Sequence, residues 1–335
     1  MNTAPSKPII LEAPVFSPEV LKWISENNFW SLWVPKTYNG LESTLTEGLQ
    51  KLQTLAKTDG SLGWTVTLCS GANYFIGNLQ PEAANHLFLT SNKPVCFGGS
   101  GGVFGNAEKQ GDNYTISGEW HYATGAPYLS HFTLNAKIMA DGKEVLNEDD
   151  MPLVYSFVIP KEAVTIIENW NTMGLKATAT HSFKVDAVVV SSKYAFVYNT
   201  FYLPQPIFKI PFSVFADLTL WVNYIGMAEH YLEEASIILE KEILEPFNSL
   251  LNKINQQIYK FAEDIEVCTN NETVITEAYI ETIHVTASAS VKDISHAILN
   301  IHPFLGIKAC SQQHVLNRIF RDYFTATQHH VFSGR

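Results

Sequence analysis

The chain has 335 residues, of which 46% are hydrophobic and 16% charged, so it can bury a large core and divide into two or three domains. Its formal net charge of -11, from 22 basic and 33 acidic residues, opposes a phosphate backbone and excludes nucleic acid as an expected partner. Widely spaced cysteines argue against a zinc site or a disulfide framework: Cys69, Cys96, Cys268 and Cys310. With no apolar export segment at the start and no uninterrupted apolar run, we expect a cytoplasmic protein without a membrane span.

The first part of the chain has a helical pattern. Ser17 is a candidate N-cap with Pro18 at the first helical position, and the apolar residues that follow share one face. A second helix is predicted at residues 46–57, where the apolar side chains form one stripe. We therefore predict an N-terminal helical domain over residues 1–94.

From residue 95 the hydrophobic period changes to two, which is typical of β-strands. Gly and Asp-Gly turns separate segments with this period, at residues 113–120, 132–138, 154–159 and 183–190. They predict a central antiparallel β-barrel or sandwich domain over residues 95–205. The glycine-rich run at residues 98–102 indicates a loop, because it lacks the strand and helix that flank a dinucleotide-binding motif.

A proline cluster, Pro204, Pro206 and Pro211, separates this region from the last third of the chain. Helical periodicity then returns in stretches at residues 213–244, 246–268, 273–299 and 312–328. We predict a C-terminal four-helix bundle over residues 206–335. The expected fold class is α+β and multidomain, with helices before and after the β domain.

Four segments carry a resemblance to a known family. Residues 33–40 read Trp-Val-Pro-Lys-Thr-Tyr-Asn-Gly, and residues 58–64 read Thr-Asp-Gly-Ser-Leu-Gly-Trp. Residues 120–125 read Trp-His-Tyr-Ala-Thr-Gly, and residues 170–181 begin Trp-Asn-Thr-Met-Gly and end Ala-Thr-His. In order and spacing, these segments resemble the acyl-CoA dehydrogenase superfamily over nearly the whole chain. The resemblance implies that fold and a flavin bound against the β domain.

The end of the chain distinguishes between branches of this superfamily. Its dehydrogenases carry a catalytic Glu after an Arg-Asp pair in the closing helix. Here Arg321 and Asp322, which we expect to pair and fix the last helix, are followed by no carboxylate. His330 occupies the Glu position, and His329 precedes it. A His at the position of His329 is typical of the superfamily's flavin-dependent monooxygenases, the hydroxylase halves of two-component systems.

The resemblance also implies a chemistry. In those monooxygenases, reduced flavin from a separate NAD(P)H:flavin reductase reacts with O2, and one oxygen atom is transferred to a phenol or aromatic heterocycle. Thr124 would lie near flavin N5 and slow the loss of a flavin hydroperoxide, and His329 would transfer the substrate's proton. His330 is a second candidate for proton transfer. Candidate contacts of the flavin, FMN or FAD, are Phe97, Ser100, Trp120, Thr124, Trp170, Thr178 and Thr180.

Each candidate also has a purely structural interpretation. Thr124 is consistent with a strand-to-turn residue whose hydroxyl satisfies a local amide, and Trp120 and Trp170 with core residues of the β domain. His329 and His330 are consistent with a solvated pair near the chain end. Adjacent helical residues share no face and are poor metal ligands, so we expect no metal site.

Three functions remain open. The first is the oxygenase component of a two-component monooxygenase, which uses reduced flavin and O2 on a small aromatic or apolar substrate. The second is an FAD-dependent acyl-CoA dehydrogenase with a relocated base, for which Asp217 is too short and one position off. The third is a non-catalytic relative that acts as a binding or scaffold protein, which a short chain and scarce arginines favour: Arg318, Arg321 and Arg335. The resemblance implies a homodimer or homotetramer.

Overall fold

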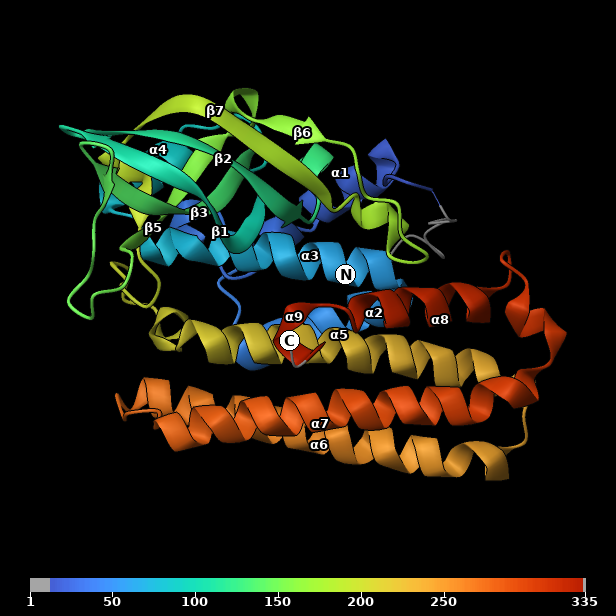
Figure 1. Ribbon diagram of the computed structural model, residues 1–335. Helices are drawn as coiled ribbons and strands as arrows, with labels where there is room; N and C mark the ends of the chain where they lie inside the picture. The colour runs from blue at the N-terminus through green and yellow to red at the C-terminus, as the bar shows by residue number, and fades with distance from the viewer. Residues whose placement is uncertain (1–12, 334–335) are drawn as a thin grey trace.

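The computed structural model describes residues 13–333. A β-sheet lies on one side and a layer of helices on the other, and α3 runs between them (Figure 1). The helices before the sheet are α1 (Pro18–Glu26), α2 (Leu45–Thr58), α3 (Gly60–Asn73) and α4 (Pro81–Leu89). Those after it are α5 (Phe212–Ala235), α6 (Lys241–Asn270), α7 (Glu277–Ile301), α8 (Val315–Ala326) and α9 (His330–Ser333).

Side-chain caps set the start of α2 and α3. The Thr44 hydroxyl accepts a hydrogen bond from the Glu47 amide, and the Glu47 carboxylate accepts one from the Thr44 amide. The Asp59 carboxylate accepts a hydrogen bond from the Leu62 amide at 3.0 Å, so α3 begins directly after α2. Nearly every residue of α3 is buried, as expected for a helix between two packed layers.

The sheet is mixed and open, so the prediction of an antiparallel barrel or sandwich was wrong. Neighbouring strands follow the order β6-β7-β2-β1-β3-β5-β8, and β4 pairs with β3. The edge strands β6 and β8 have three and two residues and lie at opposite ends of this order, so the sheet does not close. The strands are β1 (Phe97–Gln110), β2 (Asn113–Ala123), β3 (His131–Ala140), β4 (Lys143–Glu144), β5 (Val154–Pro160), β6 (Thr165–Ile167), β7 (His181–Ser191) and β8 (Ala195–Phe196).

The parallel pair at the centre of the sheet explains the mixed topology. β2 is antiparallel to β1 and therefore ends beside the start of β1. Residues 124–130 then cross that end, and β3 runs parallel to β1 on its other side. A hydrophobic period of two is the same in either direction, so the pattern of residues did not reveal this pair.

The glycine-rich run at residues 98–102 is part of β1, so the expected loop was also wrong. At Gly99, a β-carbon would lie 1.7 Å from the Thr133 carbonyl oxygen of β3. Glycine is therefore required because two backbones approach closely. The register of β1 and β3 shifts between Ser100 and Val103 and again before Gly105, which marks a bulge in this strand.

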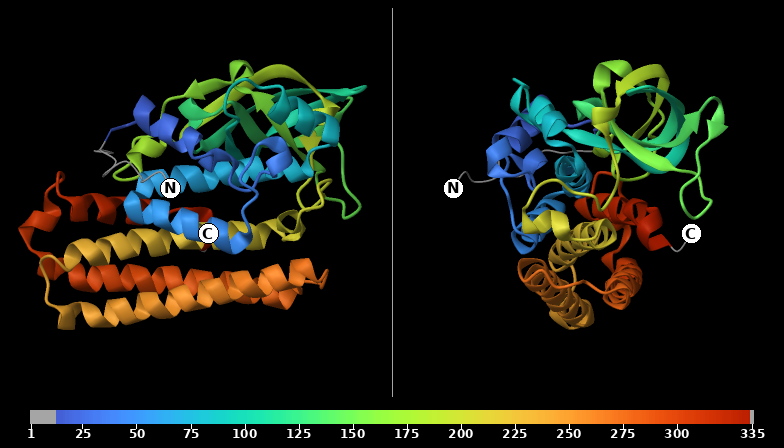
Figure 2. Two further views of the ribbon diagram at one scale, coloured as in Figure 1. Left: turned by 180° about the vertical axis from the view of Figure 1, so that it is seen from behind. Right: turned by 90° about the vertical axis from the view of Figure 1, so that its left-hand side faces the viewer.

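Helices from both ends of the chain pack together, as the views in Figure 2 show. α2 lies along α5, where a β-carbon at Gly226 would be 2.4 Å from the Gln53 carbonyl oxygen. α5 ends at Ala235, earlier than predicted, and α6 begins at Lys241 with Pro246 inside it. The division into domains at residues 94 and 205 stays a prediction.

Residues 13–333 include no helix that is both long and apolar enough to cross a membrane.

Candidate functional site

Three threonine hydroxyls meet where β2 ends, and we call Thr124, Thr178 and Thr180 the hydroxyl trio. All three side chains are buried. The Thr180 hydroxyl donates to Thr124 Oγ1 at 3.2 Å, and Thr178 Oγ1 lies 2.7 Å from Thr180 Oγ1. The three hydroxyls form one hydrogen-bonded chain, and Thr124 lies at the end of it. The structure thus brings together three of the predicted cofactor contacts.

The loop at residues 170–180 supplies two members of the trio. Leu175, with a φ of 51°, turns its carbonyl so that it accepts from the Thr178 hydroxyl at 2.7 Å and from Trp170 Nε1 at 3.0 Å. The Gly125 amide donates to the Thr178 carbonyl at 2.8 Å, which fastens the loop to the end of β2. The loop at residues 170–180 therefore holds both Trp170 and the hydroxyl trio in place.

Four aromatic rings form a row that leads to the loop at residues 170–180. We call Phe104, His121, Tyr122 and Trp170 the aromatic row. Successive ring centroids are 5.8, 5.6 and 5.8 Å apart. Phe104 is 51% and Tyr122 50% exposed, so both side chains are accessible at the surface. Trp170 is the only predicted site residue in the row.

A register shift explains why the sequence pointed to Trp120 and missed Tyr122. A strict period of two places both side chains on one side of β2. The pairing of β2 with β7 shifts between Trp120 and Ala123, so Trp120 enters the core and Tyr122 stays outside. Trp120 stacks on Phe183 at 5.5 Å and donates to the Asn135 carbonyl at 2.9 Å. The structure gives Trp120 a packing role.

Two other residues that were predicted to contact the flavin, Phe97 and Ser100, are buried in the structure. Phe97 is fully buried and packs against Phe88 of α4 with ring centroids 5.2 Å apart. The Ser100 hydroxyl donates to the His121 carbonyl at 2.8 Å and so supports the backbone of the aromatic row. Phe97 belongs to the core, whereas Ser100 acts on the row through its backbone.

His329 follows α8 and packs edge-on against Trp64 of α3, with ring centroids 5.5 Å apart. Burial, and secondly the neighbouring His330, lowers the pKa of His329 to about 4, so its ring is neutral near pH 7. His330 itself is exposed. On another side of α3, Cys69 Sγ lies 3.6 Å from the Thr124 carbonyl oxygen. The structure therefore places α3 between His329 and the hydroxyl trio.

Asp217 of α5, the carboxylate considered for a relocated base, is paired with a histidine. Its carboxylate lies 3.1 Å from His284 Nδ1 of α7, and its side chain is 5% exposed. Burial raises the pKa of Asp217, and the hydrogen bond from His284 opposes that rise. His284 in turn stacks on Phe332 at 6.2 Å. To act as a base, the Asp217 carboxylate would have to break its contact with His284.

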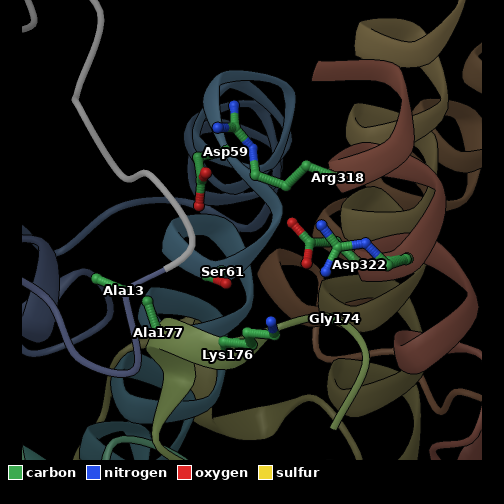
Figure 3. Close-up of a pocket in the computed structure, with 9 residues that line it drawn as sticks. Ala13, Asp59, Ser61, Gly174, Lys176, Ala177, Arg318 and Asp322 are labelled. Carbon is green, nitrogen blue, oxygen red and sulfur yellow. The ribbon is translucent and has the colours of Figure 1, made fainter. Parts of the chain in front are cut away.

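A small polar pocket lies where α3, α8 and the loop at residues 170–180 meet (Figure 3). Burial raises the pKa of both Asp59 and Asp322, and Asp59 raises the pKa of Asp322 further by charge repulsion. The charge of Arg318 opposes both shifts. The polar lining residues are Asp59, Ser61, Lys176, Arg318, Arg321 and Asp322. Within residues 13–333, no group of three or more His, Cys, Asp or Glu side chains is placed to hold a metal ion.

Known proteins share this architecture. A family model described as acyl-CoA dehydrogenase, C-terminal domain, matches residues 251–334. The crystal structure of 3-HSA hydroxylase from Rhodococcus sp. RHA1 is similar with a TM-score of 0.87 at 18% identity, covering 95% of this chain and 87% of that chain. Residues 251–334 therefore resemble the C-terminal domain of that family, and the chain shares the fold of 3-HSA hydroxylase. The resemblance predicted from the motifs is confirmed.

The relatives lie in the monooxygenase branch of this superfamily. Indole-3-acetate monooxygenase from Acinetobacter baumannii is 30% identical over 223 residues, which are 65% of this chain and 54% of the relative. XiaF from Streptomyces sp., solved in complex with FADH2 and glycerol, has a TM-score of 0.85 at 16% identity and covers 95% of this chain and 85% of that chain. The chain spans about half the length of the curated relatives that it matches.

Proposed function

We propose that this chain is the oxygenase component of a two-component flavin-dependent monooxygenase that hydroxylates a small aromatic or apolar substrate. The observation that carries the proposal is the hydroxyl trio at the end of the aromatic row. A flavin ring is flat and apolar on its faces and polar along one edge. A row of aromatic side chains, two of them half-exposed, that ends in a cluster of hydroxyls suits such a ligand.

The residues present fit a flavin ring on the sheet side of α3. Tyr122 and Trp170 would contact the ring, and Thr124 would hydrogen-bond its polar edge. We propose Lys176 of the same loop as the phosphate contact, because its side chain carries a positive charge. When bound, reduced flavin supplies the electrons that activate O2, and it comes from a separate NAD(P)H:flavin reductase.

The protein's own part in this chemistry is placement and proton transfer. Thr124 would hold the ring edge and shield it from water. His329, whose ring is neutral near pH 7, is the proposed acceptor for the proton of a phenol or a heterocyclic N–H. Because His329 lies on the helix side of α3, this role requires the substrate to reach past α3 from the flavin contacts. The indole-3-acetate monooxygenase among the relatives supports a flat aromatic substrate for this site as well.

The two alternatives differ from this proposal in the ligand they require. Acyl-CoA dehydrogenation needs a carboxylate base, and the one carboxylate considered for that role, Asp217, is bonded to His284. A non-catalytic role requires no bound flavin. Measurements of flavin binding therefore distinguish the monooxygenase, dehydrogenase and non-catalytic functions.

Reduced flavin is expected to stabilise this protein against heat more than oxidised flavin does. Anaerobic melting curves with FMN and FAD, each oxidised and reduced, measure this difference, and AMP serves as the control that carries a phosphate without the ring. A ligand at 100 times its Kd adds about 2.7 kcal/mol to the free energy of unfolding. Tighter binding of oxidised FAD, with bleaching by an acyl-CoA, would contradict the proposal and support a dehydrogenase. No shift with any flavin would support the non-catalytic alternative.

A further inference from the structure

Hydrogen bonds run without a break from α8 to the predicted flavin contacts. Asp322 Oδ1 accepts a hydrogen bond from the Leu175 amide at 2.6 Å. The Leu175 carbonyl accepts from the Thr178 hydroxyl at 2.7 Å and from Trp170 Nε1 at 3.0 Å. One loop residue therefore contacts α8 through its amide, while its carbonyl holds one member of the hydroxyl trio and one of the aromatic row.

Arg321 provides a second attachment of the same loop to α8. Its Nη1 donates to the Met173 carbonyl at 2.6 Å, and its Nε donates to Asn317 Oδ1 at 2.8 Å. At Gly174, between the two attachment points, a β-carbon would lie 2.2 Å from the Arg321 carbonyl oxygen. The loop thus rests directly on the backbone of α8, and both members of the Arg-Asp pair bind it.

Asp322 is well suited to fix this loop because its own position is fixed. The residue is 5% exposed. It also touches the start of α3, where a β-carbon at Gly60 would lie 3.3 Å from its Oδ2. A buried acceptor between two helices loses little further freedom when it holds the Leu175 amide, and a buried amide without it would be costly.

We propose that Asp322 is a positioning residue of the flavin site, which sets Leu175 and thereby the placement of Trp170 and Thr178. This inference rests on the proposed function. Asp322 touches neither the aromatic row nor Thr124, so its effect on flavin passes through the loop. Asp322 thereby has a role in flavin binding, in addition to the structural role in the last helix that we expected for the Arg-Asp pair.

Two substitutions at Asp322 separate positioning from general damage. Asp322→Ala removes the acceptor of the Leu175 amide, whereas Asp322→Asn keeps an acceptor oxygen. By hydrogen-exchange mass spectrometry, we expect the peptide over residues 170–180 to exchange about tenfold faster or more in Asp322→Ala, and near the wild-type rate in Asp322→Asn. Asp293→Ala, at an exposed position of α7, is the matched control and should leave this peptide unchanged. If Asp322→Ala does not fold, Asp322→Ser shortens the side chain, so that its oxygen lies farther from the Leu175 amide, with a smaller change in polarity.

Reduced-flavin affinity is measured on the same variants. Asp322→Ala is expected to raise the Kd about tenfold, with Asp322→Asn and Asp293→Ala near wild type. Unchanged exchange in a folded Asp322→Ala would overturn the inference. Faster exchange with unchanged flavin affinity would overturn its link to the flavin site. If the wild-type protein bound no flavin, the proposed function would fail, and the exchange rates would still decide whether Asp322 holds the loop.

Discussion

His329→Gln is expected to lower the rate of substrate hydroxylation at pH 7 by about 100-fold or more, because a positioned general base contributes about 10²–10⁴ in rate. Glutamine keeps a similar size and polarity but cannot take up the proton. Reduced-flavin affinity should stay near wild type, because α3 separates His329 from the proposed flavin contacts. Single-turnover rates with reduced flavin, O2 and a phenol or indole measure the loss.

The pH dependence follows from the pKa of His329, which burial lowers to about 4. The neutral form, which acts as the base, predominates above that pH. The titration of His329 should therefore leave the wild-type rate unchanged between pH 8 and about 5. The rate should fall as the pH approaches 4. The unfolded chain binds this proton near its ordinary pKa of about 6.5, so His329 also makes the folded protein less stable as the pH falls from about 6.5 to 4.

His330→Gln is the matched control, because His330 is exposed and adjacent. We expect its rate to stay within about twofold of wild type, as for a surface substitution away from the chemistry. Equal losses in both variants would indicate a general disturbance of the chain end. A wild-type rate in His329→Gln would remove His329 from the mechanism.

Trp120→Ala is expected to lower the free energy of unfolding by about 3–5 kcal/mol, the usual cost of truncating a buried large aromatic residue. The substitution opens a cavity beside Phe183 and leaves the Asn135 carbonyl without its donor. Urea unfolding followed by circular dichroism measures the change. The size of the effect tests whether Trp120 belongs to the core.

Trp170→Ala is the contrasting variant, since Trp170 is only partly buried and borders Tyr122 in the aromatic row. Its cost in unfolding free energy should be nearer about 1 kcal/mol, while its Kd for reduced flavin should rise about tenfold. If Trp120→Ala instead weakened flavin binding and left stability unchanged, Trp120 would be a wall of the flavin site.

Local sequence signals were sufficient for much of the helical framework. The stripe at residues 46–57 corresponds to α2, and Ser17 caps α1, because periodicity and caps depend on neighbours in the chain. The family resemblance brought Thr124, Thr178 and Thr180 to one place, although they lie up to 56 positions apart. Motif order thus carried information about contacts that hydrophobic periodicity does not contain.

The errors have physical causes in tertiary packing. The glycines at residues 98–102 suggested flexibility, whereas Gly99 is in a strand because the Thr133 carbonyl leaves no room for a side chain. Tyr122 was missed because a register shift in β2 overrides the alternation that groups it with Trp120. The hydrogen bond from the Leu175 amide to Asp322 joins residues 147 positions apart. Every non-proline residue has a backbone amide, so the residue type of Leu175 could not reveal this contact.

In the proposed function, this protein controls the reaction of reduced flavin with O2. Stopped-flow mixing of the anaerobic protein and reduced flavin with oxygenated buffer tests it most directly. We expect an oxygen-dependent absorbance transient that free flavin does not show and that decays faster in Thr124→Val, whose side chain has no hydroxyl. Oxidation of the flavin with the same time course and spectrum in the presence and absence of the protein would contradict it.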